Sequence, residues 1–445
     1  MTTLYTVTLG CPKNRVDTEV MLGYLSEAGY DIVQEPDGAD ILLVNTCGFI
    51  QPAVEEGIDI ILALEAIKAE HPGCKLVVTG CLVQRYIDNL RQELTSVDLF
   101  IGTDGFQDIV SHLRYLTKAK PPEIKRLPTY VMNGETPRRL TTPSHRAYLK
   151  ITEGCSNNCA YCMIPAIRGP LRSRSIADII PEAMLLNKNG LKEVTLVGQD
   201  LTAYGFDFGA NADRIEDLVQ ALITETTIPW LRLLYLYPTR LPNELLELMA
   251  QEERLLSYLD IPLQHISDPV LKRMKRPFGQ KHIHEVVERI RTRVPDAAIR
   301  TTFMVGFPGE TDEDVEVVAD FMKDYRLNNV GIFTYSNEEG CQAEFYKNQV
   351  EESAKQERFD YLMEIQSEIS MDLNQQYVGQ TLDVLVEGIS EETELLLEGR
   401  TRFQAPGIDG CVYIADGECD AGDMVKVEIT EAHPYDLVGK IVLER

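Results

Sequence analysis

Three cysteines stand close together in the segment EGCSNNCAYCMIP, where Cys155, Cys159 and Cys162 form a C-x3-C-x2-C array. Three thiolates on one tight loop can hold three irons of a four-iron cluster, because soft sulfur ligands suit iron–sulfur chemistry. The fourth iron then has no protein ligand and can coordinate a substrate, as the open position of a catalytic zinc does. Two other roles stay open, namely a zinc site completed by a distant cysteine or histidine, and unligated thiols in the core.

Three further cysteines each follow an apolar run: Cys11 ends YTVTLGC, Cys47 ends ILLVNTC and Cys81 ends LVVTGC. If these runs are parallel strands, their carboxyl ends share one edge of a sheet, so the three thiols converge and can ligate a second cluster. A single cysteine of this kind is more simply a small buried thiol, but three at equivalent positions argue against that role. The other cysteines are assigned to packing or to the surface: Cys74, Cys341, Cys411 and Cys419.

The N-terminal residues must supply the sheet that places Cys11, Cys47 and Cys81. YTVTLG, DILLVNT and KLVVTG have the composition of strands, and VDTEVMLGYLSEAGY and AVEEGIDIILALEAIKAEH have the period of amphipathic helices. This alternation predicts a doubly wound α/β domain with a parallel sheet over residues 2–118. Residues 119–140 are rich in proline and charge and are predicted to be a linker.

Residues 141–378 contain six predicted strands, and the array of Cys155 lies just after the first: AYLKI, VTLVG, LRLLYLY, YLDIPLQ, IRTTFMVG and NVGIFTY. Helical stretches separate them. Six such units are too few for a closed eight-fold barrel, so we predict an open (β/α)6 partial TIM barrel with its active site at the carboxyl ends of the strands. Residues 379–445 contain five short strands with glycine and aspartate turns, which predict a small all-β, OB-like barrel.

The chain has a formal charge of -27, with 43 Lys and Arg against 70 Asp and Glu. This opposes non-specific binding to nucleic acid, which needs basic side chains to displace counterions. Residues 379–445 contain 15 Asp and Glu against 5 Lys and Arg, so this barrel is complementary to a basic protein. The sequence shows no secretory signal and no apolar run of about 18 residues. We therefore expect a soluble, cytoplasmic protein whose cysteines are kept reduced.

The array of Cys155, Cys159 and Cys162 resembles the signature of radical S-adenosylmethionine (SAM) enzymes. The resemblance implies that the open iron chelates SAM, and that one-electron reduction cleaves SAM to methionine and a 5′-deoxyadenosyl radical. This radical abstracts hydrogen from an unactivated carbon. VGFPGET looks like the superfamily's glycine-rich segment beside the adenosyl group, although an ordinary tight turn is the alternative. The cofactor-binding residues expected from the resemblance and its neighbouring segments are Tyr161, Gly306, Glu310 and Arg172.

Two three-cysteine sites followed by a small β-barrel resemble the methylthiotransferase family, over essentially the whole chain. The resemblance implies an N-terminal MTTase domain, a radical SAM core and a C-terminal TRAM domain that recognises a macromolecular substrate. It implies two 4Fe-4S clusters, of which the second supplies or carries sulfur, and two uses of SAM that together replace C–H by C–S–CH3. The expected partners include an electron donor such as flavodoxin and a sulfur donor.

The family divides between enzymes that modify tRNA adenosine and a group that modifies the β carbon of an aspartate of the small-subunit ribosomal protein uS12. GCPKNRVDTE, NTCGFIQPAVEE, VTGCLVQRY, YLDIPLQHIS and TYSNEEG are similar to the second group, whereas the tRNA group typically has a basic RE-type segment in place of GFI. The acidic C-terminal barrel agrees with a basic protein substrate and disfavours nucleic acid except as part of the ribosome. A tRNA adenosine methylthiotransferase and a non-catalytic two-cluster electron carrier stay open as alternatives.

Several residues near these motifs carry separate expectations. RGPLRSR places Arg168, Arg172 and Arg174 one loop beyond the array, where they can pair with a carboxylate of SAM or of the substrate, or form surface charge. His265, in PLQHIS, is expected to be a structural histidine with satisfied hydrogen bonds. Cys341, in EEGC, stands where the family has threonine, and we expect a packing role for it.

Overall fold

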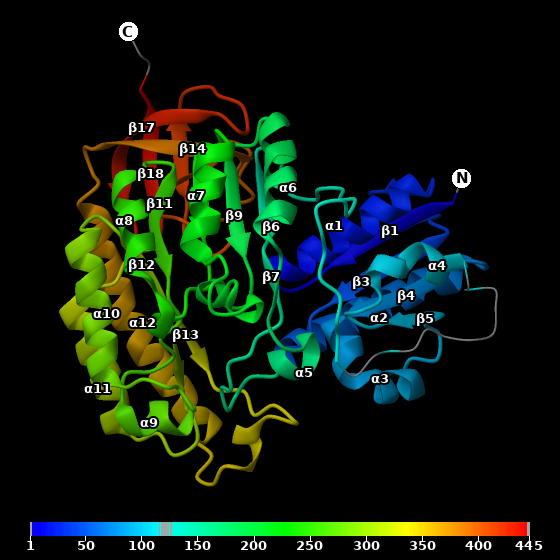
Figure 1. Cartoon of the computed structure of the whole chain (residues 1–445), viewed down its shortest axis with the longest axis horizontal. Coiled ribbons are helices and arrows are strands. Elements are labelled where there is room, and N and C mark those ends of the chain that lie inside the picture. The colour runs from blue at the N-terminus through cyan, green and yellow to red at the C-terminus, as the bar shows by residue number, and fades with distance from the viewer. Residues whose placement is uncertain (1, 115, 117–123, 125–126, 443–445) are drawn as a thin grey trace.

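The computed structural model describes residues 2–114, 116, 124 and 127–442, and its main parts are two parallel sheets and a closed β-barrel (Figure 1). The N-terminal sheet has the order β2-β1-β3-β4-β5, and all its paired strands are parallel. Its strands are β1 (Thr3–Thr8), β2 (Asp31–Val33), β3 (Ile41–Thr46), β4 (Lys75–Gly80) and β5 (Leu99–Ile101). Its helices are α1 (Pro12–Glu27), α2 (Gln51–Glu70), α3 (Cys81–Glu93), η1 (Phe106–Asp108) and α4 (Ile109–Arg114). The predicted doubly wound domain is confirmed.

The central strands of this sheet are buried on both faces. Leu43 and Val77 pack in one core with residues of α1 and α4, whereas Leu42 and Val44 pack in another with residues of α2 and α3. Successive side chains of a strand point to opposite faces, so a strand between two helical layers needs an unbroken apolar run. This is why ILLV and LVV read as strands from sequence.

The central domain has six parallel strands in an open sheet, as predicted, and their order is β13-β12-β11-β10-β9-β6. Its strands are β6 (Arg146–Lys150), β9 (Glu193–Val197), β10 (Trp230–Leu233), β11 (Leu255–Asp260), β12 (Ala298–Val305) and β13 (Asn329–Thr334). The longer helices are α6 (Ile176–Lys188), α7 (Ile215–Glu225), α8 (Asn243–Gln251), α10 (Gln280–Arg293), α11 (Asp312–Tyr325) and α12 (Glu352–Gln375). Within the described ranges, no helix is both long and apolar enough to cross a membrane.

Short strands, helices and 3-10 turns lie at the carboxyl ends of the central strands. They are the antiparallel pair β7 (Thr152–Glu153) and β8 (Arg172–Ser173), the helices α5 (Ile164–Arg168) and α9 (Asp268–Arg273), and the 3-10 turns η2 (Leu201–Ala203), η3 (Phe206–Phe208), η4 (Pro238–Arg240) and η5 (Gln342–Phe345). These elements surround the loop that carries the cysteine array, so they determine which side chains reach it.

The C-terminal domain is a five-stranded β-barrel, as predicted, and it is closed with the strand order β14-β15-β16-β18-β17. Its strands are β14 (Thr381–Ile389), β15 (Leu397–Thr401), β16 (Val412–Asp416), β17 (Met424–Ala432) and β18 (Leu437–Ile441). Alternate residues of the strands fill the interior, among them Val384, Val386, Val412, Ile414 and Val427. Closing the sheet on itself leaves no unpaired strand edge, which allows so small a domain to keep a buried core.

Some predicted boundaries are wrong by a few residues. The first strand was expected to run to Gly10, but it ends at Thr8 because the chain turns at Gly10, whose φ is 84°. LRLLYLY forms a strand only to Leu233, and Tyr235 adopts a left-handed φ of 66°. Of the predicted linker, residues 119–123, 125 and 126 lie outside the described residues, and its later part packs on the N-terminal domain through an ion pair of 2.6 Å between Arg138 and Glu19.

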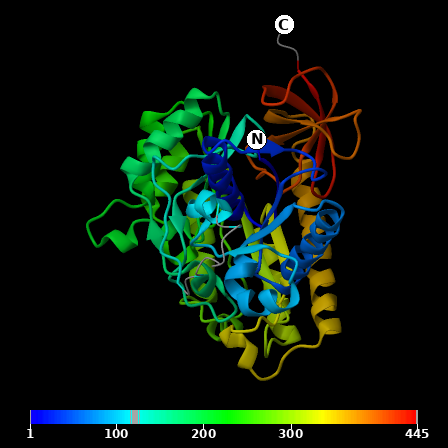
Figure 2. The ribbon, with the colours of Figure 1, turned by 90° about the vertical axis from the view of Figure 1, so that its right-hand side faces the viewer.

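The three domains share one buried core, which contains Met21 of α1, Tyr148 of β6, Tyr258 of β11 and Leu385 of β14. In the view of Figure 2, the N-terminal sheet lies in front of the central domain, and the C-terminal barrel lies above it. The C-terminal barrel packs against the amino ends of the central strands, where the first residue of β9, Glu193, pairs with side chains of both domains.

Glu193 is fully buried and accepts from Arg232 of β10 and from Arg400 of β15, at 2.6 Å each. Arg400 also pairs with Glu387 of β14 at 2.5 Å. Burial raises the pKa of Glu193, but the two guanidinium groups lower it to about 2. A buried carboxylate held in this way fixes the C-terminal barrel to the core.

Replacing Arg400 by methionine is expected to destabilise this junction by about 3–5 kcal/mol, because it leaves a buried carboxylate with one partner fewer. Trp230 is the single tryptophan of the chain and begins β10, so urea unfolding followed by its fluorescence reports this region. The pKa of Glu193 in the folded protein lies below its value of about 4.3 in the unfolded chain. Its contribution to the free energy of unfolding is therefore fully present above about pH 4.3 and is lost as the pH falls toward 2. Lys440→Ala, which breaks an exposed pair with Glu428, is the control and should change stability by under about 1 kcal/mol.

Candidate functional site

The structure places Cys155, Cys159 and Cys162 together on the loop after β7. Gly154 precedes them with a φ of 76°, and a Cβ there would lie 2.2 Å from the carbonyl oxygen of Pro170. The loop is held by hydrogen bonds from the Cys155 N–H to Gly169 and from the Cys162 N–H to Cys159. Burial raises the pKa of the Cys162 thiol well above its ordinary value, and the neighbouring thiols raise it further. A bound cation is therefore needed to hold all three as thiolates.

Cys11, Cys47 and Cys81 come together at the carboxyl edge of the N-terminal sheet. Cys11 precedes α1, Cys47 follows β3 directly and Cys81 begins α3. The approach depends on Gly10, because a Cβ at this position would lie 2.6 Å from the Cβ of Cys47. Burial raises the pKa of Cys81 to about 12, and the thiols of Cys47 and Cys11 contribute to this increase.

The six thiols form two groups of free cysteines on facing parts of two domains. Among the described residues, no three His, Cys, Asp or Glu side chains are placed to hold a single metal ion. A four-iron cluster separates its sulfur ligands more widely than one ion does, and three soft thiolates are the donor set that it requires. Both groups fit such a cluster by chemistry.

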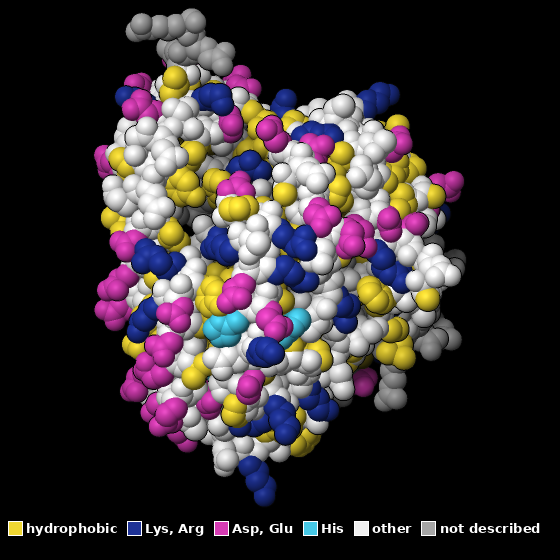
Figure 3. Space-filling view, turned by 60° about the vertical axis from the view of Figure 1, so that its left-hand side comes forward, with side chains coloured by type: hydrophobic (Ala, Val, Ile, Leu, Met, Phe, Trp, Pro, Cys, Tyr) yellow, Lys and Arg dark blue, Asp and Glu magenta, His cyan; other side chains and the backbone are white. Residues whose placement is uncertain are grey.

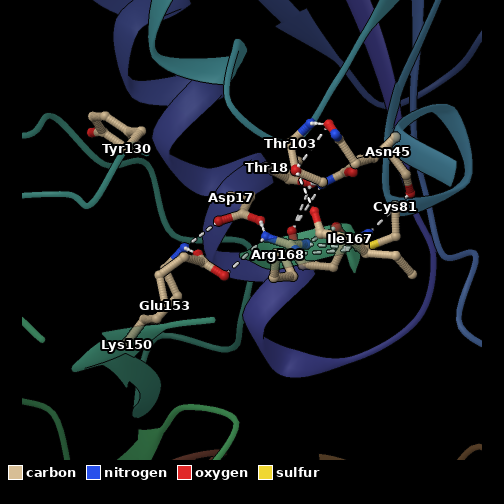
Figure 4. A network of polar contacts seen from close by, with 12 residues as sticks. Asp17, Thr18, Asn45, Cys81, Thr103, Tyr130, Lys150, Glu153, Ile167 and Arg168 are labelled. Atoms are coloured by element: carbon tan, nitrogen blue, oxygen red, sulfur yellow. Dashed lines mark hydrogen bonds and ion pairs between the residues drawn. The ribbon is translucent and has the colours of Figure 1, made fainter. Parts of the chain in front are cut away.

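Arg168, six residues after the last cysteine of the array, contacts the sulfur of Cys81 in the second group (Figure 4). It ends α5, which begins two residues after Cys162, and its buried guanidinium reaches across the domain boundary. Its Nε and Nη2 lie 3.3 and 3.2 Å from the Cys81 sulfur, and Nη2 donates to the side-chain oxygen of Asn14 at 3.1 Å. At about 1.5 Å per residue, the five-residue α5 spans only about 8 Å, so the two groups are close neighbours.

The charge of Arg168 is balanced by carboxylates from both domains. Asp17 of α1 pairs with Arg168 at 2.5 Å and also with Lys150 of β6, and Lys150 pairs with Glu153 at 2.8 Å. Figure 4 shows Asp17 between Arg168 and Lys150. Burial raises the pKa of Glu153, but Lys150 and Arg168 lower it to about 2. Sequence reasoning proposed Arg168 as a partner for a carboxylate of SAM or substrate, and the structure instead places it against Cys81.

A second buried cation, Lys13, lies beside Cys11 and was not found from sequence. Its ammonium group is 3.7 Å from the centre of the Tyr235 ring. Burial lowers the pKa of Lys13, but Tyr235 and Cys11 more than compensate, so the pKa is raised. Tyr235 follows β10 with a φ of 66°, and Gln264 follows β11 with a φ of 74°. Such strain in non-glycine residues is maintained where surrounding structure enforces it, commonly at functional sites.

The predicted cofactor-binding residues lie around the array in different ways. Tyr161 packs edge-on against Phe307, with ring centres 6.4 Å apart. The Gly306 N–H donates to both carboxylate oxygens of Glu310 at 2.9 Å, and Arg358 pairs with the same carboxylate at 3.0 Å. Glu310 therefore holds the glycine-rich turn in place. Close to the array, Arg276 lies 3.5 Å from the Cys159 sulfur, a contact that sequence reasoning missed.

The other arginines of RGPLRSR point away from the cysteines. Arg172 donates to the carbonyl oxygens of Pro170 and Arg168, at 2.9 and 3.0 Å. Arg174 is buried and pairs with Glu182 of α6 at 2.7 Å, so it is a structural residue and not surface charge. Its position in the core, which depends on where α6 packs, was not visible in the sequence.

His265 and Cys341 differ in part from expectation. His265 accepts from the Ser267 N–H at 3.0 Å, but its buried Nε2 has no hydrogen bond within the described residues and lies 3.6 Å from Glu310. The expectation of a fully satisfied histidine is therefore wrong. Cys341 is buried, as a packing role requires, but it lies near enough to Cys162 to raise the pKa of that thiol.

A groove of about 220 Å³ leads from the C-terminal barrel to the edge that carries Cys11. It is lined by Gly10 and Pro12 on one side and by Gly407 and Ile408, in the segment between β15 and β16, on the other. Although the C-terminal barrel packs at the amino ends of the central strands, this segment thus reaches toward the second cysteine group.

Three family models match three separate parts of the chain. Residues 149–322 match the radical SAM superfamily, residues 3–102 match uncharacterized protein family UPF0004 and residues 378–442 match the TRAM domain. The ribosomal protein uS12 methylthiotransferase RimO of Desulfotalea psychrophila is 50% identical over 437 residues, which cover 98% of each chain. That of Citrifermentans bemidjiense is 46% identical over 441 residues, covering 98% of this chain and 97% of the relative.

Solved structures support the fold. The radical SAM methyltransferase TsrM from Kitasatospora setae, with tryptophan and a SAM analogue bound, aligns with a TM-score of 0.54 and 14% identity over 75% of this chain and 73% of that chain. The cobalamin-dependent radical SAM enzyme OxsB aligns with a TM-score of 0.54 and 13% identity over 82% of this chain and 56% of that chain. At this level of identity the two structures show a shared fold only.

Proposed function

The chain belongs to the ribosomal protein uS12 methylthiotransferase family of radical SAM enzymes, and from this premise we propose that it replaces C–H by C–S–CH3 on the β carbon of an aspartate of uS12. Members of the radical SAM superfamily use SAM and a 4Fe-4S cluster. The observation that carries the proposal is the closeness of two three-cysteine groups, because Arg168 at the end of the helix after Cys162 contacts the sulfur of Cys81.

We propose that Cys155, Cys159 and Cys162 hold the cluster that binds SAM, and that Cys11, Cys47 and Cys81 hold a second 4Fe-4S cluster that supplies the sulfur. When bound, these groups supply the electron, the 5′-deoxyadenosyl radical and the sulfur that the replacement needs. Of the residues implied by resemblance, Tyr161 and Gly306 are proposed to contact SAM. Glu310 and Arg172 are proposed to act on SAM through the loops that they hold.

The chain's own charges suit this division of roles. The second group lies beside two buried cations, Lys13 and Arg168, whereas the first lies beside Arg276. α1 and α3 also begin at or directly after their cysteines, so their N-terminal dipoles face the thiolates. Positive charge of this kind stabilises thiolates together with a further anionic sulfur species. We propose that Lys13 and Arg168 hold this negative charge in a site that excludes water.

The acidic C-terminal barrel supports a basic protein over RNA as the substrate. Its strands and loops carry three times as many acidic as basic residues, 15 against 5 from Gly379 to Arg445. A phosphate backbone would be repelled by this surface, whereas a lysine- and arginine-rich protein would be attracted. We also propose that the reaction takes its electron from a donor such as flavodoxin and its sulfur from a separate donor.

Cells that lack this gene test the proposal. Mass spectrometry of uS12 and of digested tRNA from such cells should show an unmodified uS12 aspartate and unchanged tRNA adenosines. Reintroducing the intact gene should restore the modified aspartate, whereas a variant whose acidic barrel is exchanged for a basic one should not. Loss of a tRNA modification with uS12 unchanged would instead assign the chain to the tRNA enzymes.

A further inference from the structure

One stretch of this acidic chain is strongly basic. From Lys272 to Arg293 there are eight Lys and Arg but only two Glu, whereas the whole chain has 43 basic and 70 acidic residues. The stretch covers the last residues of α9, the turn after it and all of α10. Runs of one charge are often only a solvated face, so the position of this stretch relative to the cysteine array decides what it can do.

The start of the stretch packs directly on the loop of the array. The Ala160 N–H donates to the carbonyl oxygen of Met274 at 3.0 Å, and Arg276 lies 3.5 Å from the Cys159 sulfur. Lys275 stands between these two contacts, and consecutive Cα atoms are about 3.8 Å apart. Arg240 of η4 donates to Asn157 of the same loop at 2.7 Å and pairs with Asp200 at 2.5 Å. Basic side chains therefore flank the array where it meets the surface.

Lysines of this region are free to meet a partner. Lys272, Lys275 and Lys281 are exposed, and within the described chain neither Lys272 nor Lys275 pairs with a carboxylate. Lys281 has one contact with Glu285, at 3.7 Å, and its side chain is 91% exposed. We call the surface formed by Arg240, Lys272, Arg273, Lys275 and Lys281 the array-side basic surface.

The array-side basic surface and the acidic barrel lie at opposite ends of the central domain. In Figure 1, α9 is at the bottom of the molecule and the strands of the C-terminal barrel are at the top. Figure 3 shows Lys and Arg side chains toward the lower end of the face that it presents, with Asp and Glu along its left edge. A basic partner at the barrel and an acidic partner at the array therefore need not compete for one surface.

We propose that the array-side basic surface is the docking site of an acidic, one-electron donor protein of the reduced-flavin class. The inference rests on the proposed function, because that function requires an electron at the cluster held by Cys155, Cys159 and Cys162. One electron leaves the reduced flavin and one enters the cluster, and no atom is transferred. Opposite charges draw the two proteins together and orient them, so the effect falls mainly on the rate of association and weakens with salt.

The test compares two electron sources in the reconstituted full-length protein. Lys272→Glu, Lys275→Glu and Lys281→Glu are combined in one variant, and 5′-deoxyadenosine formation is measured with a reduced, acidic flavodoxin and, separately, with dithionite. At low salt we expect the flavodoxin-driven rate to fall about tenfold or more, while the dithionite-driven rate stays at that of the unmodified protein. Raising the salt concentration should slow the unmodified protein with flavodoxin but have little effect on the variant.

A matched control reverses three exposed charges elsewhere. Lys188 is the last residue of α6, and Lys323 and Arg326 lie at the C-terminal end of α11. Because α11 is about 21 Å long, Lys323 and Arg326 lie far from the array. Arg326 also has a left-handed φ, as Lys275 does. The docking site would be wrong if the control variant lost as much of the flavodoxin-driven rate as the first variant does. It would also be wrong if the first variant kept both the flavodoxin-driven and the dithionite-driven rate. Loss of both rates in the first variant would assign its lysines to cluster assembly. An unmodified protein that forms no 5′-deoxyadenosine with dithionite would overturn the proposed function itself.

Discussion

Replacing Cys11, Cys47 and Cys81 together by alanine will abolish methylthio transfer to uS12 but will leave SAM-dependent 5′-deoxyadenosine formation in place. The reason is that the two groups belong to different domains, because the loop of the array is held by backbone hydrogen bonds to Gly169 and Met274 of the central domain. The iron content after anaerobic reconstitution should fall from about eight to about four atoms per chain, since we propose that each group holds one four-iron cluster.

The reciprocal variant, with alanine at Cys155, Cys159 and Cys162, should also retain about four irons but form no 5′-deoxyadenosine. Cys74→Ala and Cys419→Ser, which change thiols outside both groups, should leave the iron content and both reactions as they are. A full complement of iron in the first variant would show that Cys11, Cys47 and Cys81 are not cluster ligands. A chain that binds eight irons yet never cleaves SAM would be an electron carrier and not an enzyme.

The second large effect is expected at Arg168, where methionine should lower the free energy of unfolding by about 3–5 kcal/mol. The substitution leaves Asp17 and Glu153 buried and paired with Lys150 but without the Arg168 guanidinium, and it removes both N–H contacts to the Cys81 sulfur. We expect iron to be lost from the N-terminal group in preference to the array, because Arg168 donates to Cys81 and to no cysteine of the array.

A double-mutant cycle with Asp17→Asn separates the ion pair from the sulfur contact. If the pair is the main source of stability, the two single changes should be strongly non-additive in urea unfolding. Arg168→Lys keeps the charge but cannot make both N–H contacts with the Cys81 sulfur. Compared with Arg168→Met, it should therefore restore most of the free energy of unfolding but less of the iron content. Additive effects in the cycle, or full retention of iron in Arg168→Met, would contradict this account of Arg168.

The fold was predictable because the composition of the strands and their alternation with helices both indicate parallel sheets covered by helices. ILLV and LVV are apolar without interruption because both faces of their sheet are covered by helices. The meeting of Cys11, Cys47 and Cys81 followed from this, since the strands before them are parallel. The array of Cys155 needed no fold at all, because its spacing alone brings the thiols onto one loop.

The contacts between domains were not predictable in the same way. Arg168 and Cys81 are 87 residues apart in sequence, and Glu193 and Arg400 are 207 residues apart. Their pairing depends on how finished domains dock, and no local period or motif encodes docking. The same limit applies to Lys13 and Tyr235, which meet only because the N-terminal sheet lies over the carboxyl end of β10. Local patterns were thus enough to find the two groups of cysteines, whereas the charged residues around them could be identified only from the structure.

The most direct test of the central claim is mass spectrometry of purified uS12 after anaerobic incubation with the reconstituted protein, SAM, sulfide and dithionite. We predict a mass gain equivalent to CH2S, located by fragmentation on the β carbon of one aspartate, and no change in tRNA included in the same reaction. A methylthio group found on a tRNA adenosine, with uS12 unmodified, would contradict the account.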